Sequence, residues 1–182
     1  MYKRQVQEKH AHDYVSYVDK ASEKKVVSAL RKLLPEAGFI AEEGSAAYSD
    51  ETYCWVVDPL DGTTNYIHDN APYCVSIALR DKQSLLLGVV YEPCRDECFY
   101  AWKGGGAYVN GERLRVSLVS EPKDAFVVTE LPYNFEQYAR TGEHLIHELY
   151  GKVAGIRMNG SAALALCYVC LLYTSDAADD KA

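Results

Sequence analysis

The sequence predicts a mixed α/β domain in which helices cover a mostly antiparallel sheet. Three features predict it: a long amphipathic helix near the start, a meander of short apolar strands after it, and a hairpin centred on Asn110-Gly111. The Asn-Gly pair favours a two-residue hairpin loop, because both residues tolerate the positive φ angles of a type I′ turn. With 182 residues, 48% of them hydrophobic, the chain is long enough to bury one core. We therefore expect a single layered domain.

The long helix is expected over residues 14–34. Valines and leucines recur there at mostly helical spacing, with Lys and Glu between them, until Pro35 ends the pattern. The valine and leucine face should pack on the sheet. The basic residues of the opposite face should stay exposed, namely Lys24, Lys25 and Arg31.

Short strands and two further helices account for most of the remaining chain. Runs of apolar residues end there at turns rich in Gly, Pro, Asn and Asp. The expected strands cover residues 39–41, 53–57, 73–80, 85–91, 98–102, 107–109, 114–116, 125–129 and 155–158. The further helices are expected over residues 135–150 and 161–172.

Charge and composition exclude several classes of partner. The formal net charge is −7, and no block of Lys and Arg is dense enough to hold a phosphate backbone, so we expect no nucleic acid partner. No apolar run reaches the roughly 18 residues of a membrane helix. The first nine residues are too polar for a secretory signal. We expect a soluble cytoplasmic protein without a membrane partner.

The six cysteines are scattered among apolar runs, which indicates reduced thiols and no disulfide scaffold. Cys94 with Cys98, and Cys167 with Cys170, have spacings that could be read as zinc pairs. The first pair flanks a charged turn, and the second lies in a helical apolar stretch. We assign a zinc site to neither pair.

The stretch with the most chemical information covers residues 55–65. Asp58 and Asp61 stand there three residues apart, across a proline and at the end of an apolar strand. Two unit charges about 4 Å apart repel by roughly 4 kcal/mol at an effective dielectric of about 20, and Glu42 or Glu43 at the end of the preceding strand adds to the repulsion. A bound cation relieves it, and carboxylate oxygens suit Mg²⁺ or Mn²⁺.

A purely structural interpretation of the same residues stays open. Asp58 could simply end its strand, and Asp61 could cap a short helix over residues 62–65. Such a helix start would also aim backbone N–H groups at an anion. Taken alone, Gly160-Ser161 is a helix cap and Asp19 is a solvated helix residue.

These residues resemble the inositol monophosphatase family, within the larger group of lithium-sensitive, magnesium-dependent phosphatases. Residues 55–65 are similar to the family signature W-[IV]-[IV]-D-P-[IL]-D-G-T-T-N, and residues 39–43 to its F-I-x-E-E element. Three further elements resemble residues 13–19, 104–117 and 155–163. The resemblance covers residues 13–169 and implies a layered α-β-α-β-α sandwich of the sugar phosphatase type.

The resemblance also implies a role for each candidate residue. Glu42, Asp58, Asp61 and the main-chain carbonyl of Leu60 would bind Mg²⁺. Asp19 and Thr63 would hold and polarise the attacking water, so that no protein nucleophile is needed. The substrate would contact two turns, through Leu60, Asp61, Gly62, Thr63, Gly160, Ser161 and Ala162.

The expected function is hydrolysis of inositol monophosphate or a similar small phosphate ester, and the full-length form could be a homodimer. Residues 63–65 follow the inositol monophosphatase form, while histidinol-phosphate and fructose-bisphosphate phosphatases stay open as alternatives. A non-catalytic metal-binding or regulatory relative, or an inactive fragment, is the alternative from a different class.

The chain is expected to be a C-terminally truncated piece of such an enzyme. The family pattern continues through residue 169, and residues 170–182 look like a non-native tail in place of a further strand and a W-D-x-A-A-G element. Asp176-Ala177-Ala178 resembles that element only superficially. We therefore expect an incomplete sandwich, exposed apolar surface, and weak or absent hydrolysis by this chain alone.

Overall fold

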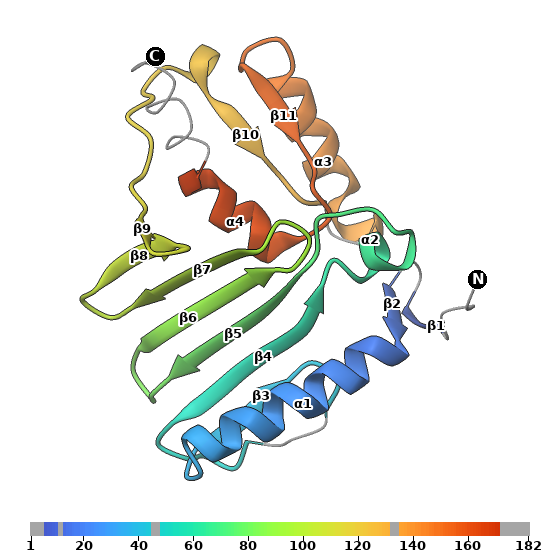
Figure 1. Cartoon of the computed structure of the whole chain (residues 1–182). Helices are drawn as coiled ribbons and strands as arrows, with labels where there is room; N and C mark the ends of the chain where they lie inside the picture. Colours follow the sequence, from blue (N-terminus) through green and yellow to red (C-terminus); the bar gives the residue numbers. More distant parts are fainter. Residues whose placement is uncertain (1–5, 11–12, 45–47, 132–134, 172–182) are drawn as a thin grey trace.

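A computed structural model describes residues 6–10, 13–44, 48–131 and 135–171, so residues 172–182 of the expected tail lie outside it. Figure 1 shows the elements in chain order. They are β1 (Val6–His10), β2 (Asp13–Ser16), α1 (Tyr17–Leu33), β3 (Gly38–Ala41), β4 (Cys54–Asp61), α2 (Thr63–Ile67), β5 (Cys74–Arg80), β6 (Leu85–Glu92), β7 (Glu97–Trp102), β8 (Gly106–Val109), β9 (Glu112–Arg113), the 3₁₀ helix η1 (Pro122–Asp124), β10 (Phe126–Val128), α3 (Phe135–Leu149), β11 (Gly155–Arg157) and α4 (Ala162–Leu171).

Seven strands form the central sheet, in the order β3-β4-β5-β6-β7-β8-β9. β3 runs parallel to β4, and each later neighbouring pair in this sheet is antiparallel. Two small sheets accompany it, antiparallel β1-β2 and parallel β10-β11. The predicted meander is confirmed as β5, β6 and β7, whose β-branched and aromatic residues suit a pleated surface.

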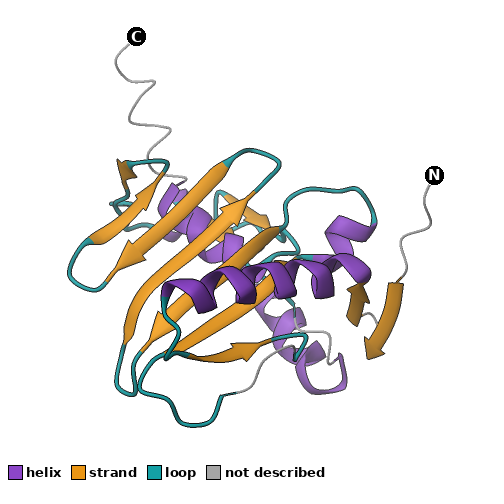
Figure 2. Cartoon of the chain, turned by 60° about the horizontal axis from the view of Figure 1, so that its bottom comes forward, coloured by secondary structure: helices purple, strands orange, loops and turns teal. Residues whose placement is uncertain are grey.

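Helix α1 covers one face of the central sheet, as Figure 2 shows. Its Val27 and Leu30 join a core cluster with Phe39, Trp55 and Val57 of the two parallel strands. Burying a side chain of this size fully stabilises the fold by about 1.5–3 kcal/mol. The parallel pair β3-β4, whose ends carry the predicted acidic residues, is therefore fixed against α1.

Helix α4 covers the opposite face. Leu164 and Tyr168 of this helix pack in a second core cluster with Cys74 and Phe99 of the sheet. The helix also contacts β10, so it lies between the central sheet and the small sheet β10-β11. Helix and sheet layers thus alternate, and the predicted mixed α/β fold is confirmed.

The N-terminal helix is shorter than the sequence predicted. It begins at Tyr17, because residues 13–16 form strand β2, which satisfies its backbone groups by pairing with β1. At the other end Leu33 is 74% exposed and does not join the predicted apolar face. The predicted exposure of the basic face is confirmed for Lys24, Lys25 and Arg31.

The Asn110-Gly111 hairpin is confirmed, since the two residues have φ angles of 46° and 92°. Its second strand ends at Arg113, so the strand expected over residues 114–116 was wrong. Leu114 makes one more backbone bond to β8, from its N–H to the Ala107 carbonyl. Its side chain then packs on the second core cluster, which turns the chain away from the sheet edge.

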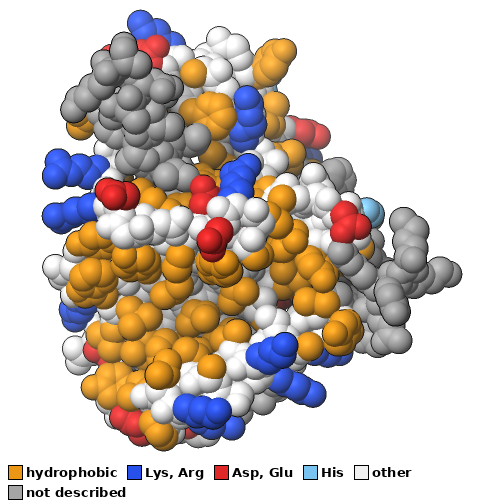
Figure 3. Space-filling view, viewed as in Figure 1, with side chains coloured by type: hydrophobic (Ala, Val, Ile, Leu, Met, Phe, Trp, Pro, Cys, Tyr) orange, Lys and Arg blue, Asp and Glu red, His pale blue; other side chains and the backbone are white. Residues whose placement is uncertain are grey.

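Part of the sheet surface is apolar and open. Figure 3 shows hydrophobic side chains gathered over the central sheet beside α1. The rings of Tyr100, Trp102 and Tyr108 are nearly parallel, the sheet register places Tyr100 on the same face as Val57, and Trp102 is 48% exposed. Within the described residues, no helix is long and apolar enough to cross a membrane.

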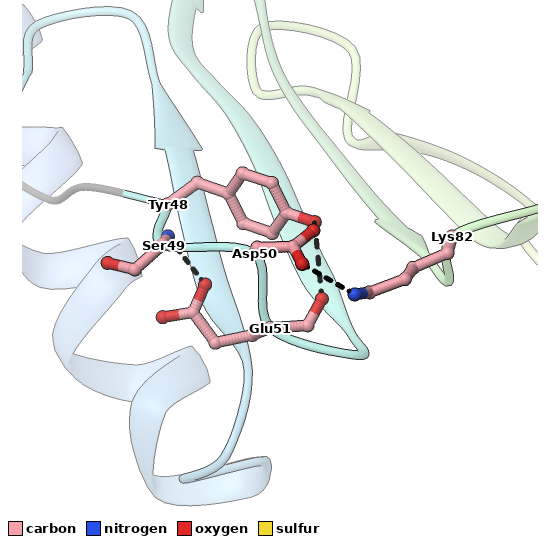
Figure 4. A network of polar contacts seen from close by, with 5 residues as sticks. All are labelled: Tyr48, Ser49, Asp50, Glu51 and Lys82. Atoms are coloured by element: carbon pink, nitrogen blue, oxygen red, sulfur yellow. Dashed lines mark hydrogen bonds and ion pairs between the residues drawn. The ribbon is translucent and has the colours of Figure 1, made fainter.

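The connection from β3 to β4 is held at the start of β4 by a polar network (Figure 4). Lys82, from the β5-β6 turn, pairs with Asp50 at 2.8 Å. The Tyr48 hydroxyl donates to the Glu51 carbonyl at 3.2 Å, and the Ser49 amide donates to the Glu51 carboxylate at 2.7 Å. These bonds fix the end of the connection that is remote from the acidic strand ends.

Candidate active site

The parallel pairing of β3 and β4 brings two predicted acidic residues to one edge of the sheet. Ala41 is paired with Val57, and the amide of Glu42 extends this ladder by donating to the Val57 carbonyl at 3.2 Å. Glu42 and Asp58 therefore follow each other across neighbouring strands. Their side chains meet, as a hydrogen bond between the two carboxyl groups shows.

The pKa of Asp58 is raised by burial and by the neighbouring carboxylates. Burial is the largest cause that raises the pKa of Asp58, followed by the negative charge of Glu42, the hydrogen bond with Glu42 and the charge of Asp61. Together they raise this pKa from 3.8 to about 8. Asp58 therefore keeps a proton at neutral pH unless a cation takes the proton's place.

Pro59 shapes the turn between the two aspartates. The Leu60 amide donates to Asp58 Oδ1 at 3.0 Å, which closes a turn across the proline. The pairing of β4 with β5 shifts register between Asp58 and Asp61, so the strand bulges there. The bulge turns Asp61 away from the Glu42–Asp58 pair and toward α4.

Asp61 is bound by the first turn of α4. Ser161 Oγ donates to Asp61 Oδ2 at 2.6 Å, and the Ala163 amide donates to the same oxygen at 2.7 Å. The Cys74 thiol lies 3.8 Å from this oxygen. Burial, above all, raises the pKa of this thiol, so Cys74 stays protonated. The carboxylate at the end of β4 is thus tied to a helix 100 residues further along the chain.

The three carboxylates have not gathered around one point. Among the side chains that the structure describes, no three carboxylate, imidazole or thiol groups are close enough together to hold a metal ion. Asp58 faces Glu42, whereas Asp61 faces Ser161. The donor chemistry still fits Mg²⁺, because all three side chains offer carboxylate oxygens, which are the ligands that this cation prefers.

The predicted water-binding pair is brought together across 44 residues of sequence. Thr63 Oγ1 lies 3.0 Å from Asp19 Oδ1 and 2.9 Å from the Leu60 carbonyl, and its single proton can be given to either acceptor. Asp19 is only 3% exposed. The interpretation of Asp19 as a solvated helix residue was therefore wrong.

The two predicted substrate-binding turns lie against each other. Gly62 and Gly160 both have positive φ, and a Cβ atom added to Gly62 would lie 3.1 Å from the Gly160 carbonyl oxygen. Asn65 joins the turns, because its Nδ2 donates to the carbonyls of Pro72 at 2.8 Å and Asn159 at 2.7 Å. A short helix is confirmed here as α2, but its N-cap residue is Gly62 and no side chain caps it, so the expected cap by Asp61 was wrong.

Side chains of the protein itself already bind the polar groups of the turn at Gly160. Glu130, two residues after the end of β10, accepts from the amides of Asn159 at 2.8 Å and Gly160 at 3.0 Å. The Ser161 hydroxyl is turned to Asp61, and Ser161 is 2% exposed, whereas Ala162 is exposed. The Gly160 amide and the Ser161 hydroxyl therefore stabilise the turn itself.

Two acidic residues of this region were not predicted from the sequence. Glu23 is fully buried in α1 and accepts from the Glu43 amide at 2.6 Å. A signal existed, because Asp19, Glu23 and Val27 recur every four residues and so lie on the buried face of the helix. Glu130 follows an expected strand directly, as Glu42 does.

Known proteins resemble this chain both in sequence and in fold. The sequence profile of the inositol monophosphatase family matches residues 2–173. The chain belongs to the inositol monophosphatase family. The family signature at residues 55–65 is thus the segment that forms most of β4 and the start of α2.

Individual members of the inositol monophosphatase family match most of this chain. Nus factor SuhB of Escherichia coli K12 is 41% identical over 163 residues, which are 89% of this chain and 61% of the relative. Inositol-1-monophosphatase of Rhizobium meliloti is 39% identical over 170 residues, 91% of this chain and 63% of the relative. The crystal structure of extragenic suppressor protein suhB from Bartonella henselae is 38% identical, with a TM-score of 0.86 over 91% of this chain and 64% of that one. The chain therefore spans less than two thirds of the length of these relatives.

Proposed function

We propose that this chain belongs to a magnesium-dependent phosphatase that hydrolyses inositol monophosphate or a similarly small phosphate monoester. The observation that carries the proposal is the contact of the Glu42 and Asp58 carboxyls at the edge of two parallel strands, with Asp61 near enough to raise the pKa of Asp58. Such a cluster is unfavourable without a cation. Membership of the family adds the reaction class.

Glu42, Asp58, Asp61 and the Leu60 carbonyl would hold Mg²⁺. The bound metal would lower the pKa of a water molecule and stabilise charge on the phosphoryl oxygens. Metal binding would require two changes in these carboxylates. Asp58 would give up its proton. Asp61 would keep one oxygen on the Ser161 hydroxyl and turn the other toward the metal.

Asp19 and Thr63 would orient the attacking water. When the Thr63 hydroxyl donates to Asp19, its lone pairs remain to accept a hydrogen bond from a water molecule. The buried Asp19 carboxylate fixes the direction of that hydroxyl. A water held in this way presents its oxygen to the phosphorus in line with the leaving alcohol.

The phosphate end of the substrate would lie over the two glycine turns. The positive φ of Gly62 and Gly160 lets both backbones approach closely: a Cβ atom added to Gly160 would lie 2.8 Å from Asn65 Oδ1, and one added to Gly62 would crowd the Gly160 carbonyl oxygen at 3.1 Å. Leu60, Asp61, Thr63, Ser161 and Ala162 would complete the contacts, as the resemblance implies. The Gly160 amide would have to leave Glu130 to take part.

A second candidate is a non-catalytic or regulatory role that keeps the fold and the metal site. Several relatives carry the name Nus factor SuhB, and this observation favours it. Histidinol-phosphate and fructose-bisphosphate phosphatases are the alternatives among substrates. From the sequence we also propose that the full-length form is a homodimer and that it is located in the cytoplasm.

A substrate panel tests the proposal. Because the chain spans less than two thirds of its relatives, residues 1–169 should be joined to the C-terminal part of E. coli SuhB and assayed beside the chain alone. We expect Mg²⁺-dependent release of phosphate from inositol monophosphate by the chimera, its loss in Asp58→Asn and Asp61→Asn, and little or no turnover by the chain alone. A folded chimera that binds Mg²⁺ and cleaves no phosphomonoester would favour the non-catalytic role.

A further inference from the structure

Helix α1 places two buried carboxylates one helical turn apart beneath the strand ends. Asp19 is 3% exposed and Glu23 is fully buried. Residues four apart lie on one face of a helix, and like charges at this spacing destabilise it. The proposed water site accounts for Asp19, whereas Glu23 has no part in it.

We propose that Glu23 is a positioning residue that fixes Glu42 for metal binding. The inference rests on the proposed function, because it takes Glu42 as a metal ligand. Glu23 acts on the turn that directly follows β3. It would not touch the metal or the substrate itself.

The turn after β3 is held by backbone bonds on one side and by Glu23 on the other. The Glu42 amide donates to the Val57 carbonyl of β4 at 3.2 Å. The next amide, that of Glu43, donates to Glu23 Oε2 at 2.6 Å. A hydrogen bond of this length to a carboxylate is among the stronger ones in proteins. Glu42 is therefore anchored on both of its peptide groups, to β4 before it and to α1 after it.

Gly44 completes this anchoring. Its amide donates to the Ala41 carbonyl at 3.1 Å, and its φ of 72° lets the chain reverse. The far end of the same connection is fixed by the network of Tyr48, Asp50 and Lys82 (Figure 4). Glu23 supplies the corresponding side-chain acceptor at the end of the connection next to the site.

The same helix face reaches both halves of the site. Asp19 lies within hydrogen-bond distance of the Thr63 hydroxyl, which follows β4, and Glu23 accepts from the Glu43 amide, which follows β3. Since α1 also packs on β4 through the first core cluster, it sets the relative positions of the two strand ends. Loss of the Glu23 acceptor would free the turn that carries Glu42 from α1, and it would leave the contact between Asp19 and Thr63 in place.

Two variants of the 182-residue chain test the proposal, with Mn²⁺ as the probe and electron paramagnetic resonance of free Mn²⁺ as the readout. Glu23→Ala removes the acceptor, and Glu23→Gln keeps an acceptor oxygen of similar shape without the charge. Glu36→Ala, an exposed acid just after the same helix, is the matched control. Hydrogen exchange of the Glu43 amide in metal-free protein measures the bond itself.

We expect Glu23→Ala to weaken Mn²⁺ binding by about 10- to 100-fold, as is typical when a residue that orients a metal ligand is lost. Glu23→Gln should weaken it less, Glu36→Ala should not change it, and Glu43 exchange should speed up in Glu23→Ala alone. If Glu23→Ala does not fold, the Glu23→Gln variant decides. Mn²⁺ affinity equal to that of the unmodified chain in the folded Glu23 variants overturns the proposal. An unmodified chain that binds no Mn²⁺ contradicts the proposed function instead, and the exchange of Glu43 then still reports whether Glu23 holds the turn.

Discussion

Replacing Asp58 by Asn should make the metal-free protein more stable, and the gain should grow with pH. In the folded state burial and the neighbouring carboxylates raise the pKa of Asp58 from 3.8 to about 8, while the unfolded chain loses that proton near its ordinary value. The folded state therefore binds more protons between these pH values. Stability must fall as the pH rises from about 4 to about 8, because the unfolded state is then favoured by loss of the proton. The amide that replaces the carboxyl group in Asp58→Asn carries no charge, so this loss disappears.

The size of the effect follows from the shift and from the exposure of the group. One pKa unit corresponds to about 1.4 kcal/mol, so the full rise sets a ceiling of about 5–6 kcal/mol. Asp58 is only half-buried, so water screens part of this energy. We expect a gain of about 2 kcal/mol above pH 8, which for a domain of this length raises Tm by about 4–8 °C.

Thermal unfolding in the presence of a chelator, followed by circular dichroism near pH 5 and near pH 9, measures this gain. Asp124→Asn, at an exposed position of η1, is the control and should shift Tm little at either pH. The gain in Asp58→Asn should be large near pH 9 and small near pH 5. An Asp58→Asn protein that is no more stable than the unmodified chain at the higher pH would refute the reasoning.

Three further outcomes are expected. Asn65→Ala removes two hydrogen bonds that join the glycine turns and should lower the free energy of unfolding by about 1–3 kcal/mol in urea titrations; no change would mean that the turns hold without it. Leu164→Ala in the second core cluster should cost about 2–5 kcal/mol, while Leu166→Ala on the same helix, 76% exposed, should cost less than about 0.5; equal costs would contradict the assigned packing. Lithium at millimolar levels should inhibit phosphate release by the chimera. If lithium does not inhibit it, the alternative of a fructose-bisphosphate or histidinol-phosphate phosphatase is favoured.

The sequence predicted the acidic strand ends and most strands, because those features are local. A strand that ends in Asp58-Pro59, and one that ends in Glu42, can be found from apolar runs and breakers alone. The Asn110-Gly111 turn is equally local. The extent of α1 was not, because residues 13–16 pair with β1 and tertiary pairing overrides the helical spacing there.

Long-range contacts explain what the sequence could not supply. Asp61 was expected beside Asp58, yet its carboxylate binds Ser161 and Ala163 on a helix at the end of the described chain. No spacing rule predicts that partner. The partners of Glu23 and Glu130 could not be predicted for the same reason, since each carboxylate accepts from a backbone amide at least 20 residues away. The roles of Asp19 and Thr63 came from the family resemblance, and the structure adds the contact between them.

The most direct test of the metal site is a Mg²⁺ titration by calorimetry at about pH 7, repeated in two buffers of different ionisation enthalpy. If Asp58 holds a proton at this pH and belongs to the metal site, Mg²⁺ must displace that proton, because metal ligands have to be deprotonated. We predict binding with release of about one proton per metal ion, and loss of that release in Asp58→Asn. Binding without proton release, or proton release unchanged in Asp58→Asn, would contradict the assignment of Asp58 to the metal site.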